Sequence, residues 1–552
     1  MPVTDGDRSL TELISSLLVT IPNLLSFKSK WSSIRAKLTD LDTHLTDISD
    51  FSSSSANQLS LDLLASVRDT LNDAVSVASR CEGRDLSQGK LKTQSEVDSV
   101  AARLDRHARD ADVLIKSGVL LQDSKLKLTV PSSTTKKEGI RSEASELVVR
   151  LQIGSAESKT SAIDSLLELI NGDDKNVMIA VAQGVVPVLV RLLDTCLKEK
   201  SVAAISRISA VESSRHVLIA EGLSLLNHLL RVVESGSGYA KEKACVALQA
   251  LSFSKENARA IGCRGGISSL LEICGEGSPA SQGFAAGVLR NLALFGENKE
   301  NFLEEGAVSV LVTLGCSGTP LARENAIGCL ANLTSSGDGD EEEEMVVLVV
   351  REGGIKMLKS FLDSSNAKSL EVGVLLLKNL ATCPVVREVV VSEGFISRLV
   401  PLLSCGVLGV RIAAAEAVAS LGYTTKSRKE IGVSIGGLIE MLDGKAVEEK
   451  EAASKALSTL LVCASNRKIF KKSEQGILSL VQLLDPNIKK LDKRYAVSAL
   501  ELLVSCKKCR KRVVAAGACL HLQTLVEMDV EGAKKLAENL ARSKIWGVFA
   551  RP

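Results

Sequence analysis

With 552 residues, the chain is too long for one compact core and long enough for a repeat array joined to a further domain. Its residues are 45% hydrophobic but only 3% aromatic, so the core must consist mainly of leucine, valine, alanine and isoleucine. A net charge of +2 gives no general attraction to nucleic acid. No apolar run reaches the roughly 18 residues that a membrane-spanning helix needs.

The ends of the sequence and its cysteines predict an intracellular location. The first residues lack the basic start and apolar stretch of a signal peptide. Pro2 excludes the N-terminal glycine of myristoylation, and Arg551-Pro552 offers no prenylation box. The 13 cysteines are odd in number and form no disulfide framework, which is typical of a reducing compartment. We therefore expect a protein of the cytoplasm, with the nucleus as a second location.

Residues 1–122 are predicted to form a bundle of four helices. Their apolar residues recur in steps of three and four, the spacing that places side chains on one face of a helix. Pro22 ends the first helix, because proline cannot continue it, and residues 52–55 are expected to form a loop. The polar residues 123–142 are expected to form a linker. The four apolar series cover residues 10–21, 24–48, 63–78 and 97–115.

Beyond the linker, a glycine opens the same apolar phrase nine times, at intervals of 38 to 47 residues. A period of that length is typical of stacked helical repeats, each too small to bury a core alone. Such arrays expose a long groove that holds other polypeptides. The nine glycines are Gly184, Gly222, Gly265, Gly306, Gly353, Gly394, Gly436, Gly476 and Gly517.

Each repeat is predicted to contain three helices. An apolar helix follows the glycine, an alanine-rich helix comes next, and a short helix leads into the following glycine. Glycine suits these helix ends because a positive φ carries no Cβ penalty there. Alanine lets neighbouring helices approach closely while it keeps helix propensity high. Residues 184–193, 285–293 and 256–261 are examples of the three segments.

The repeats resemble the armadillo-repeat family. Residues 352–355 (Glu-Gly-Gly-Ile) and 289–293 (Leu-Arg-Asn-Leu-Ala) match two parts of that family's consensus in one phase. HEAT repeats have a similar length but lack this glycine register. The resemblance covers residues 143–548 and implies a right-handed α-solenoid. The expected architecture is therefore all-α, with the helical bundle followed by about nine armadillo repeats over residues 143–552.

The order of bundle and repeats is similar to that of plant armadillo proteins related to the U-box ubiquitin ligases. The residues between the bundle and the first repeat are too few for a U-box. They also contain neither its Cys-Pro-Ile core nor its Asp-Pro-Val-like segment. Ligase activity is therefore not carried over, and the resemblance implies an adaptor that lacks this catalytic module.

We expect neither enzymatic activity nor a metal or other cofactor, because no residues form a recognisable catalytic pattern. The five histidines show no Ser/His/Asp or metal-ligand spacing, and His107 and His228 are expected to be surface or hydrogen-bonded residues. Cys506 and Cys509 form a lone CxxC pair, with no second pair to complete a zinc site. Structural thiols are the favoured interpretation, and a metal or redox role is the alternative.

The resemblance also implies a peptide-binding site. In family members the third helices line a concave groove, where one asparagine in each holds the backbone of an extended peptide. An asparagine suits this role because its side chain both donates and accepts hydrogen bonds. Asn291, Asn332 and Asn379 occupy that position in three successive repeats. The alternative is that these asparagines only tie down helix ends locally.

The residues beside the asparagines bear on the charge of the ligand. Nuclear-import adaptors place a tryptophan four residues before the asparagine, whereas this chain has Gly287, Gly328 and Leu375 there. Recognition of a nuclear-localisation signal is therefore not expected. Arg290 and Lys378 favour an acidic or phosphorylated partner segment. The alternative is that the helix phase turns both side chains outward.

Two charge clusters stand out in the repeats. Residues 338–344 (Asp-Gly-Asp-Glu-Glu-Glu-Glu) lie in the longest interval and are expected to form an acidic loop, either solvated or regulatory. Residues 507–512 (Lys-Lys-Cys-Arg-Lys-Arg) resemble a nuclear-import signal or a phosphate-binding patch. In register they fall in a first helix, where residues 426–429 and 466–468 are also basic. A charged outer helix face is the favoured interpretation.

Taken together, these features predict a non-enzymatic scaffold that binds an extended partner segment in the concave groove. Two other functions stay open. One is a peripheral membrane adaptor, as some vacuolar armadillo proteins are, which requires a lipid anchor or a basic amphipathic surface. The other is a component of the ubiquitin pathway that acts without its own U-box.

Overall fold

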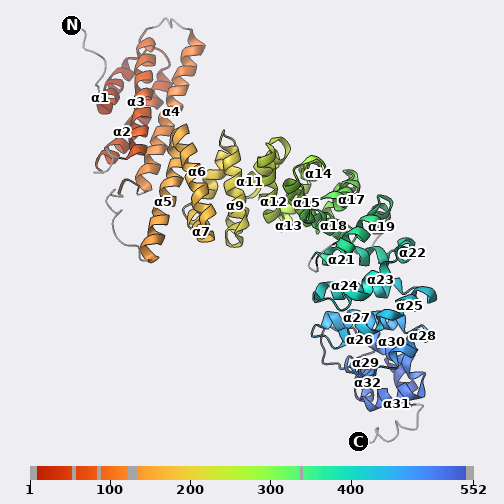
Figure 1. Ribbon diagram of the computed structural model, residues 1–552. Helices are drawn as coiled ribbons and strands as arrows, with labels where there is room; N and C mark the ends of the chain where they lie inside the picture. The colour runs from red at the N-terminus through yellow and green to blue at the C-terminus, as the bar shows by residue number, and fades with distance from the viewer. Residues whose placement is uncertain are drawn as a thin grey trace. The chain divides into compact units, whose positions relative to one another are not determined.

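The computed structural model describes residues 9–51, 57–83, 89–117, 119–121, 133–335, 340–364, 366 and 369–541, and these residues contain helices and no strand. The chain divides into two compact units, residues 1–251 and 252–552. Helices α1 to α12 belong to the first unit and α13 to α33 to the second (Figure 1). The predicted all-α solenoid fold is confirmed.

The first unit begins with four helices that lie side by side (Figure 1). Most of the predicted apolar residues are buried in one hydrophobic cluster, with Trp31 fully buried among them. Ion pairs from Lys30 to Asp98 (2.6 Å) and from Lys37 to Asp105 (2.8 Å) connect α2 to α4 across the surface. The four helices are α1 (Leu10–Thr20), α2 (Lys28–Ser49), α3 (Gln58–Cys81) and α4 (Lys90–Lys116).

Local sequence sets both ends of α1. Ser9 and Glu12 form a reciprocal capping box that satisfies backbone N–H groups at the helix start. The helix ends at Thr20, and a 3-10 turn that contains Pro22, η1 (Ile21–Asn23), follows it. The predicted stop at Pro22 is therefore confirmed, whereas the loop predicted at residues 52–55 lies outside the described residues.

Helix α5 (Ser133–Ile153) begins within residues 123–142, so the second half of the predicted polar linker is helical. The C-terminal part of α5 is anchored by apolar packing, and Val149 belongs to the same hydrophobic cluster as α1 to α4. Once anchored, a helix extends readily through residues with good helix propensity such as Lys137 and Glu138. The predicted division of the chain at residues 122 and 143 stays a prediction.

After α5 and α6 (Ala156–Gly172), the described residues form nine successive triads of helices. The triads are α7 (Asp174–Ala182), α8 (Val185–Leu192), α9 (Lys198–Ala210); α10 (Arg215–Ala220), α11 (Gly222–Ser235), α12 (Gly238–Leu251); α13 (Lys255–Gly262), α14 (Gly266–Glu276), α15 (Pro279–Leu292); α16 (Lys299–Glu304), α17 (Ala307–Ser317), α18 (Pro320–Leu333); α19 (Asp340–Arg351), α20 (Gly354–Ser364), α21 (Leu370–Thr382); α22 (Pro384–Ser392), α23 (Phe395–Leu402), α24 (Leu408–Leu421); α25 (Thr425–Ile431), α26 (Ile435–Leu442), α27 (Val447–Leu460); α28 (Ala464–Phe470), α29 (Glu474–Gln482), α30 (Lys493–Val504); and α31 (Lys507–Ala515), α32 (Ala518–Glu527), α33 (Ala533–Ala541). Short 3-10 turns lie at η2 (Val119–Leu121), η3 (Glu212–Ser214), η4 (Gly296–Asn298) and η5 (Gly432–Ser434).

Within each unit, the third helix of a triad packs against the third helix of the next triad. In the second unit this produces one continuous layer of α15, α18, α21, α24, α27, α30 and α33. Small residues allow the close approach: a Cβ atom added to Gly283 of α15 would lie 3.1 Å from Leu321 Cδ2. We call these seven helices the third-helix layer.

Seven of the nine repeat glycines have a positive φ, as the sequence predicts, and Gly394 (φ 77°) is typical of them. The prediction is wrong for Gly436 and Gly476. The 3-10 turn η5 runs directly into α26, which already includes Gly436. Ser473 caps α29 three residues before Gly476, which lies inside that helix with Phe470 too close for a Cβ atom.

The acidic loop expected over residues 338–344 is wrong for residues 340–344, because α19 begins at Asp340. Acidic residues are favourable at the start of a helix, where the helix dipole is positive. Residues 338 and 339 lie outside the described residues. The long interval therefore holds an extended first helix rather than an inserted loop alone.

Candidate partner-binding surface

The third helix α21 presents a narrow strip of partly exposed side chains. Glu371, Leu375, Lys378 and Thr382 are at least partly exposed, while most of their neighbours are buried. Their spacing of four, three and four residues places them on one face of the helix. The strip runs beside Asn379, which is only 4% exposed, rather than through it.

The three predicted ladder asparagines all connect one repeat to the preceding residues through Nδ2. Asn332 donates to the carbonyl oxygen of Arg290 (2.9 Å), and Asn379 donates to that of Ala331 (2.8 Å). Asn291 donates to the hydroxyl oxygen of Ser252 (2.9 Å). These bonds support the alternative interpretation, in which the asparagine side chains hold nearby parts of the protein in place, because their amide nitrogens are already used. Binding of a peptide by the same residues stays a prediction.

Arg290 packs against Gly328, the position at which nuclear-import adaptors have a tryptophan. A Cβ atom added to Gly328 would be 2.6 Å from Arg290 Nε, so the arginine side chain covers this glycine. Arg290 Nη1 also donates to Asn325 Oδ1 at 3.4 Å, and the buried Asn325 donates to the carbonyl oxygen of Gly283 (2.9 Å). The guanidinium is therefore held between two repeats and remains half-buried.

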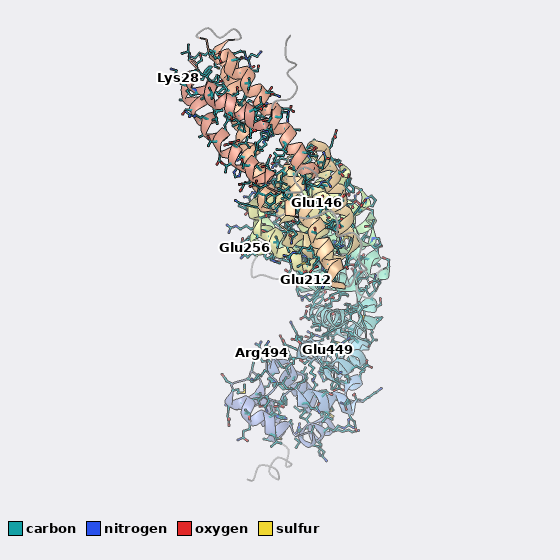
Figure 2. The ribbon with its side chains drawn as sticks, turned by 90° about the vertical axis from the view of Figure 1, so that its left-hand side faces the viewer. Lys28, Glu146, Glu212, Glu256, Glu449 and Arg494 are labelled. Atoms are coloured by element: carbon teal, nitrogen blue, oxygen red, sulfur yellow. The ribbon has the colours of Figure 1, made fainter. Side chains whose placement is uncertain are left out.

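Lys378 points toward the next repeat, where its Nζ lies 3.1 Å from Glu416 Oε2 of α24. Both side chains are half-buried. One repeat further, Arg411 pairs with the buried Glu449 of α27 at 2.6 Å (Figure 2 labels Glu449). The cations on this part of the layer are thus already compensated by carboxylates from the following repeat.

Sequence reasoning missed Glu416. It lies four residues before Ser420, the register position that Leu375 and the two glycines occupy in earlier repeats. A carboxylate in the alanine-rich phrase at residues 414–417 is the signal that could have revealed it. Its effect is to make the exposed strip mixed in charge rather than purely basic.

A second surface is built by the first helices of the last three triads, α25, α28 and α31. Arg512 of α31 donates to the carbonyl oxygen of Lys471 (3.2 Å) and so links two of them. The lysines that are exposed on these three helices form no ion pair with the described residues. By contrast, Glu297, Glu300 and Glu304 make the first-helix segment of the fourth triad acidic. The exposed lysines, named here the basic first-helix surface, are Lys426, Lys429, Lys468, Lys472, Lys507, Lys508 and Lys511.

The first unit holds a small polar cavity of about 250 Å³ between α8, α9 and α11. His228 Nδ1 and Arg231 each lie 3.2 Å from Asp194 Oδ1. The hydroxyls that line the cavity are already used, because Thr195 donates to Leu192 O (2.7 Å) and Ser235 to Arg231 O (2.9 Å). His228 is therefore a hydrogen-bonded residue without an adjacent activated nucleophile, as the sequence analysis expects.

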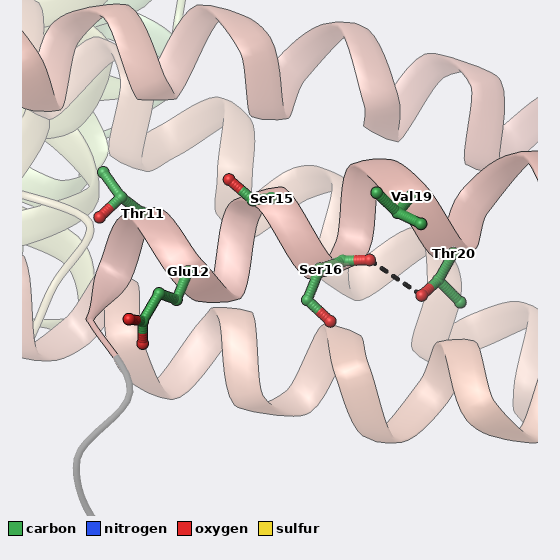
Figure 3. Close-up of a pocket in the computed structure, with 6 residues that line it drawn as sticks. All are labelled: Thr11, Glu12, Ser15, Ser16, Val19 and Thr20. Carbon is green, nitrogen blue, oxygen red and sulfur yellow. Dashed lines mark hydrogen bonds between the residues drawn. The ribbon is translucent and has the colours of Figure 1, made fainter.

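A shallow depression of about 560 Å³ lies over α1 (Figure 3). All six residues that line it come from this one helix, and Thr20 Oγ1 donates to the Ser16 carbonyl oxygen (2.9 Å). Hydroxyls that bond their own backbone are typical of an exposed helix face. This depression contains no charged group except Glu12, which belongs to the capping box.

Two further properties concern the described residues only. No group of three His, Cys, Asp or Glu side chains is arranged to hold a metal ion. No single helix there is long and apolar enough to cross a membrane, although two bent pairs of helices reach the required length and apolarity together.

Comparison with protein families gives a match for the N-terminal part of the chain. A family model described as a domain of unknown function (DUF7032) matches residues 8–119, which contain α1 to α4. No curated protein matches the chain. The family description thus covers the helical bundle and names no activity.

Solved structures match larger parts of the chain. An engineered protein aligns with 72% of this chain and 99% of its own length, with a TM-score of 0.62 and 24% identity. A second engineered protein covers 43% of this chain and 96% of itself, with a TM-score of 0.39 and 24% identity. A designed armadillo repeat protein in complex with a (KR)4 peptide covers 42% of this chain and 98% of its own length, with a TM-score of 0.37 and 21% identity. The likeness to the first extends to the fold alone, and the triads form an array of helical repeats.

Proposed function

We propose that this protein is a non-enzymatic scaffold that binds an extended segment of a partner protein along the exposed strip of the third-helix layer. The supporting observation is that four successive third helices each carry a partly exposed polar side chain in their second half, namely Arg290, Asn332, Lys378 and Glu416. Armadillo-like repeats are usually non-catalytic scaffolds, and extended segments suit surfaces that repeat at regular intervals.

The asparagines would contribute one hydrogen bond each rather than two. Their Nδ2 atoms are occupied by the neighbouring repeat. For Asn332 and Asn379, the described residues provide no donor to Oδ1, so this oxygen could accept from a backbone N–H of the ligand. In this arrangement the ladder sets the register of the ligand while it also holds the repeats together.

The chemistry of the strip favours an acidic or phosphorylated segment. Lys378 would exchange the carboxylate of Glu416 for that of the ligand, and Arg290 would supply a second cation two repeats earlier. Hydrogen bonds to charged groups are about twice as strong as neutral ones. Because Glu416 competes for Lys378, a phosphate with its higher charge would bind more tightly than a single carboxylate.

The test compares two lysines of the same repeat. Peptides selected from a displayed random library are measured by fluorescence anisotropy against the wild type, Lys378→Glu in α21 and Lys356→Glu in α20. Lys356 is exposed on the second helix, so the two variants change charge equally on different faces. We expect Lys378→Glu to weaken binding at least about tenfold, because a charge-assisted bond becomes a repulsion.

A photoreactive group on the selected peptide then locates the site. Cross-links to α15, α18, α21 and α24 support the proposal. Equal weakening by both variants, or cross-links only to first or second helices, would contradict it. Alanine at the asparagines is less informative, because it would also loosen the contact between repeats.

A second candidate function, peripheral attachment to an anionic membrane, is favoured by the basic first-helix surface. Lysine-rich surfaces attract anionic lipids with about 1 kcal/mol for each charge. We expect sedimentation with phosphatidylserine vesicles to fall at least about tenfold in Lys468→Glu/Lys511→Glu and to stay unchanged in Lys356→Glu. Binding to neutral phosphatidylcholine vesicles by both variants would contradict this candidate.

For its location we propose the cytoplasm, with the nucleus as a second place. All thirteen cysteines are free thiols, which suits a reducing compartment. A role in the ubiquitin pathway without a U-box stays a prediction.

A further inference from the structure

Two of the first helices, α13 and α25, begin at a capping residue whose hydrogen-bond partner lies three positions later. In α25 the partners are Thr424 and Ser427, which form a capping box with their hydroxyl oxygens 3.0 Å apart. Side chains at these two positions therefore meet at the helix start. In α31 the same positions are occupied by Cys506 and Cys509, so two thiols replace the two hydroxyls.

The two thiols have different surroundings. Cys506 caps α31 in an extended conformation (φ −91°, ψ 124°) and is half-exposed, whereas Cys509 is 2% exposed. Hydrogen bonds from the backbone N–H groups of Cys509 and Lys508 lower the pKa of the Cys506 thiol. Burial raises the pKa of Cys509, whose thiol is hydrogen-bonded to that of Cys506. A half-exposed thiol with a lowered pKa thus lies beside a buried thiol with a raised pKa.

We propose that Cys506 and Cys509 form a reversible dithiol–disulfide pair that reacts with low-molecular-weight disulfides of the glutathione class. The thiolate of Cys506 attacks one sulfur of the disulfide, forms a mixed disulfide and releases one thiolate. Cys509 then loses its proton and attacks Cys506 Sγ, which closes the intramolecular disulfide and releases the second thiol. The protein dithiol is oxidised by two electrons, and the small disulfide is reduced to two thiols.

A third cysteine, Cys463, provides a control for this reaction within the same protein. Cys463 caps α28 in the same way, and hydrogen bonds with Ser465 lower its pKa as well. The position three residues later holds Asn466, which donates to Arg428 O (2.7 Å) and has no thiol. Cys463 therefore has no thiol at the resolving position, and it is less exposed than Cys506, so any adduct that forms there should stay a mixed disulfide.

The experiment equilibrates the full-length protein with glutathione buffers of increasing oxidation, quenches with acid and maps the cysteines by mass spectrometry after pepsin digestion. We expect wild type to lose two hydrogens between Cys506 and Cys509 and to regain them in excess reduced glutathione. Cys509→Ser, which recreates the serine of α25, should trap a mixed disulfide at Cys506. Cys506→Ser should leave Cys509 at least about tenfold less reactive.

Two results would overturn the proposal. One is a mixed disulfide at Cys506 in wild type without closure to Cys509, the behaviour expected of Cys463. The other is closure only under conditions in which far-UV circular dichroism shows loss of helix. Closure in the folded protein at Cys506 and Cys509, with adducts alone at Cys463, supports it independently of any peptide binding.

Discussion

At the residue scale, buried polar side chains decide how the repeats are joined. Asn379 is 4% exposed, and its Nδ2 donates both to Ala331 O (2.8 Å) and to Thr334 Oγ1 (3.2 Å). Asn332 is half-buried and donates once, to Arg290 O. Removing a buried donor leaves its acceptors without a partner, whereas water can replace a donor near the surface. The two asparagines are therefore expected to differ in their effect on stability.

We expect Asn379→Ala to lower the free energy of unfolding by about 1–3 kcal/mol and Asn332→Ala by about 1 kcal/mol or less. Urea denaturation followed by circular dichroism measures both. Lys356→Ala, at an exposed position of the neighbouring helix α20, serves as the control and should be close to neutral. An Asn379→Ala variant as stable as wild type would refute the role of this asparagine as an inter-repeat tie.

His107 gives a pH-dependent prediction for the helical bundle. It is buried in α4, and its Nε2 lies 2.8 Å from Thr70 Oγ1 of α3. Burial, followed by the nearby Arg103 and Arg106, lowers the pKa of His107 from 6.5 to about 4. Because the folded protein binds this proton less well than the unfolded chain, the stability due to neutral His107 is complete above pH 6.5 and is lost as the pH falls toward 4.

Between about pH 7.5 and about pH 5, this linkage amounts to about 2 kcal/mol. The free energy of unfolding should therefore fall by about 2 kcal/mol more in wild type than in His107→Gln, which keeps a hydrogen-bonding group for Thr70 but does not titrate. Denaturation curves at the two pH values measure the difference. Equal losses in the two proteins would show that His107 titrates normally.

At the element scale, the start of two neighbouring second helices, α23 and α26, depends on backbone conformation rather than on space. Gly394 has φ 77° and caps α23, whereas Gly436 lies inside α26 at the equivalent place in the next repeat. A Cβ atom would meet no other atom within 4 Å at either position. The two glycines therefore isolate the effect of φ from that of packing.

We expect Gly394→Ala to destabilise the protein by about 1 kcal/mol, because a positive φ is costly for any residue with a Cβ atom. Gly436→Ala should instead stabilise it by about 0.5–1 kcal/mol, because alanine has the higher helix propensity and restricts the unfolded chain. Thermal melts of the two variants and wild type provide the comparison. The same sign of change in both would contradict this account.

At the scale of the whole molecule, the second unit is a row of similar units that contact mainly their neighbours. The third helices pack in sequence order, and α33 contacts α30 and α32. In such arrays stability is shared between adjacent repeats, and a terminal repeat can be lost without collapse of the rest. The last triad, α31 to α33, is the natural place to test this property.

A chain that stops at residue 505 lacks α31 to α33 and should keep the helicity of the remaining residues. Its unfolding midpoint should fall by a few degrees, because α30 loses the packing that α33 provides. Far-UV circular dichroism during thermal unfolding measures both quantities. Loss of cooperative unfolding in the shortened chain would mean that the second unit folds as one body.

Sequence alone determined the class of fold, the three-helix repeat and the starts of most second helices. These features depend on residues close together in the chain: apolar periodicity, alanine-rich phrases, the stop at Pro22 and the glycines with positive φ. It also located the register of the asparagines, although not their hydrogen bonds. The sequence did not predict that residues 133–142 and 340–344 are helical, because their polar composition is equally typical of a loop.

Only the tertiary structure decided which polar groups are already used. Asn332 bonds a residue 42 positions earlier, and Asn379 one 48 positions earlier. Glu416 meets Lys378 from the next repeat, and the two thiols of α31 are distinguished by burial. Such contacts depend on how one repeat stacks on another, and stacking follows from the packed side chains of two triads rather than from the pattern within one.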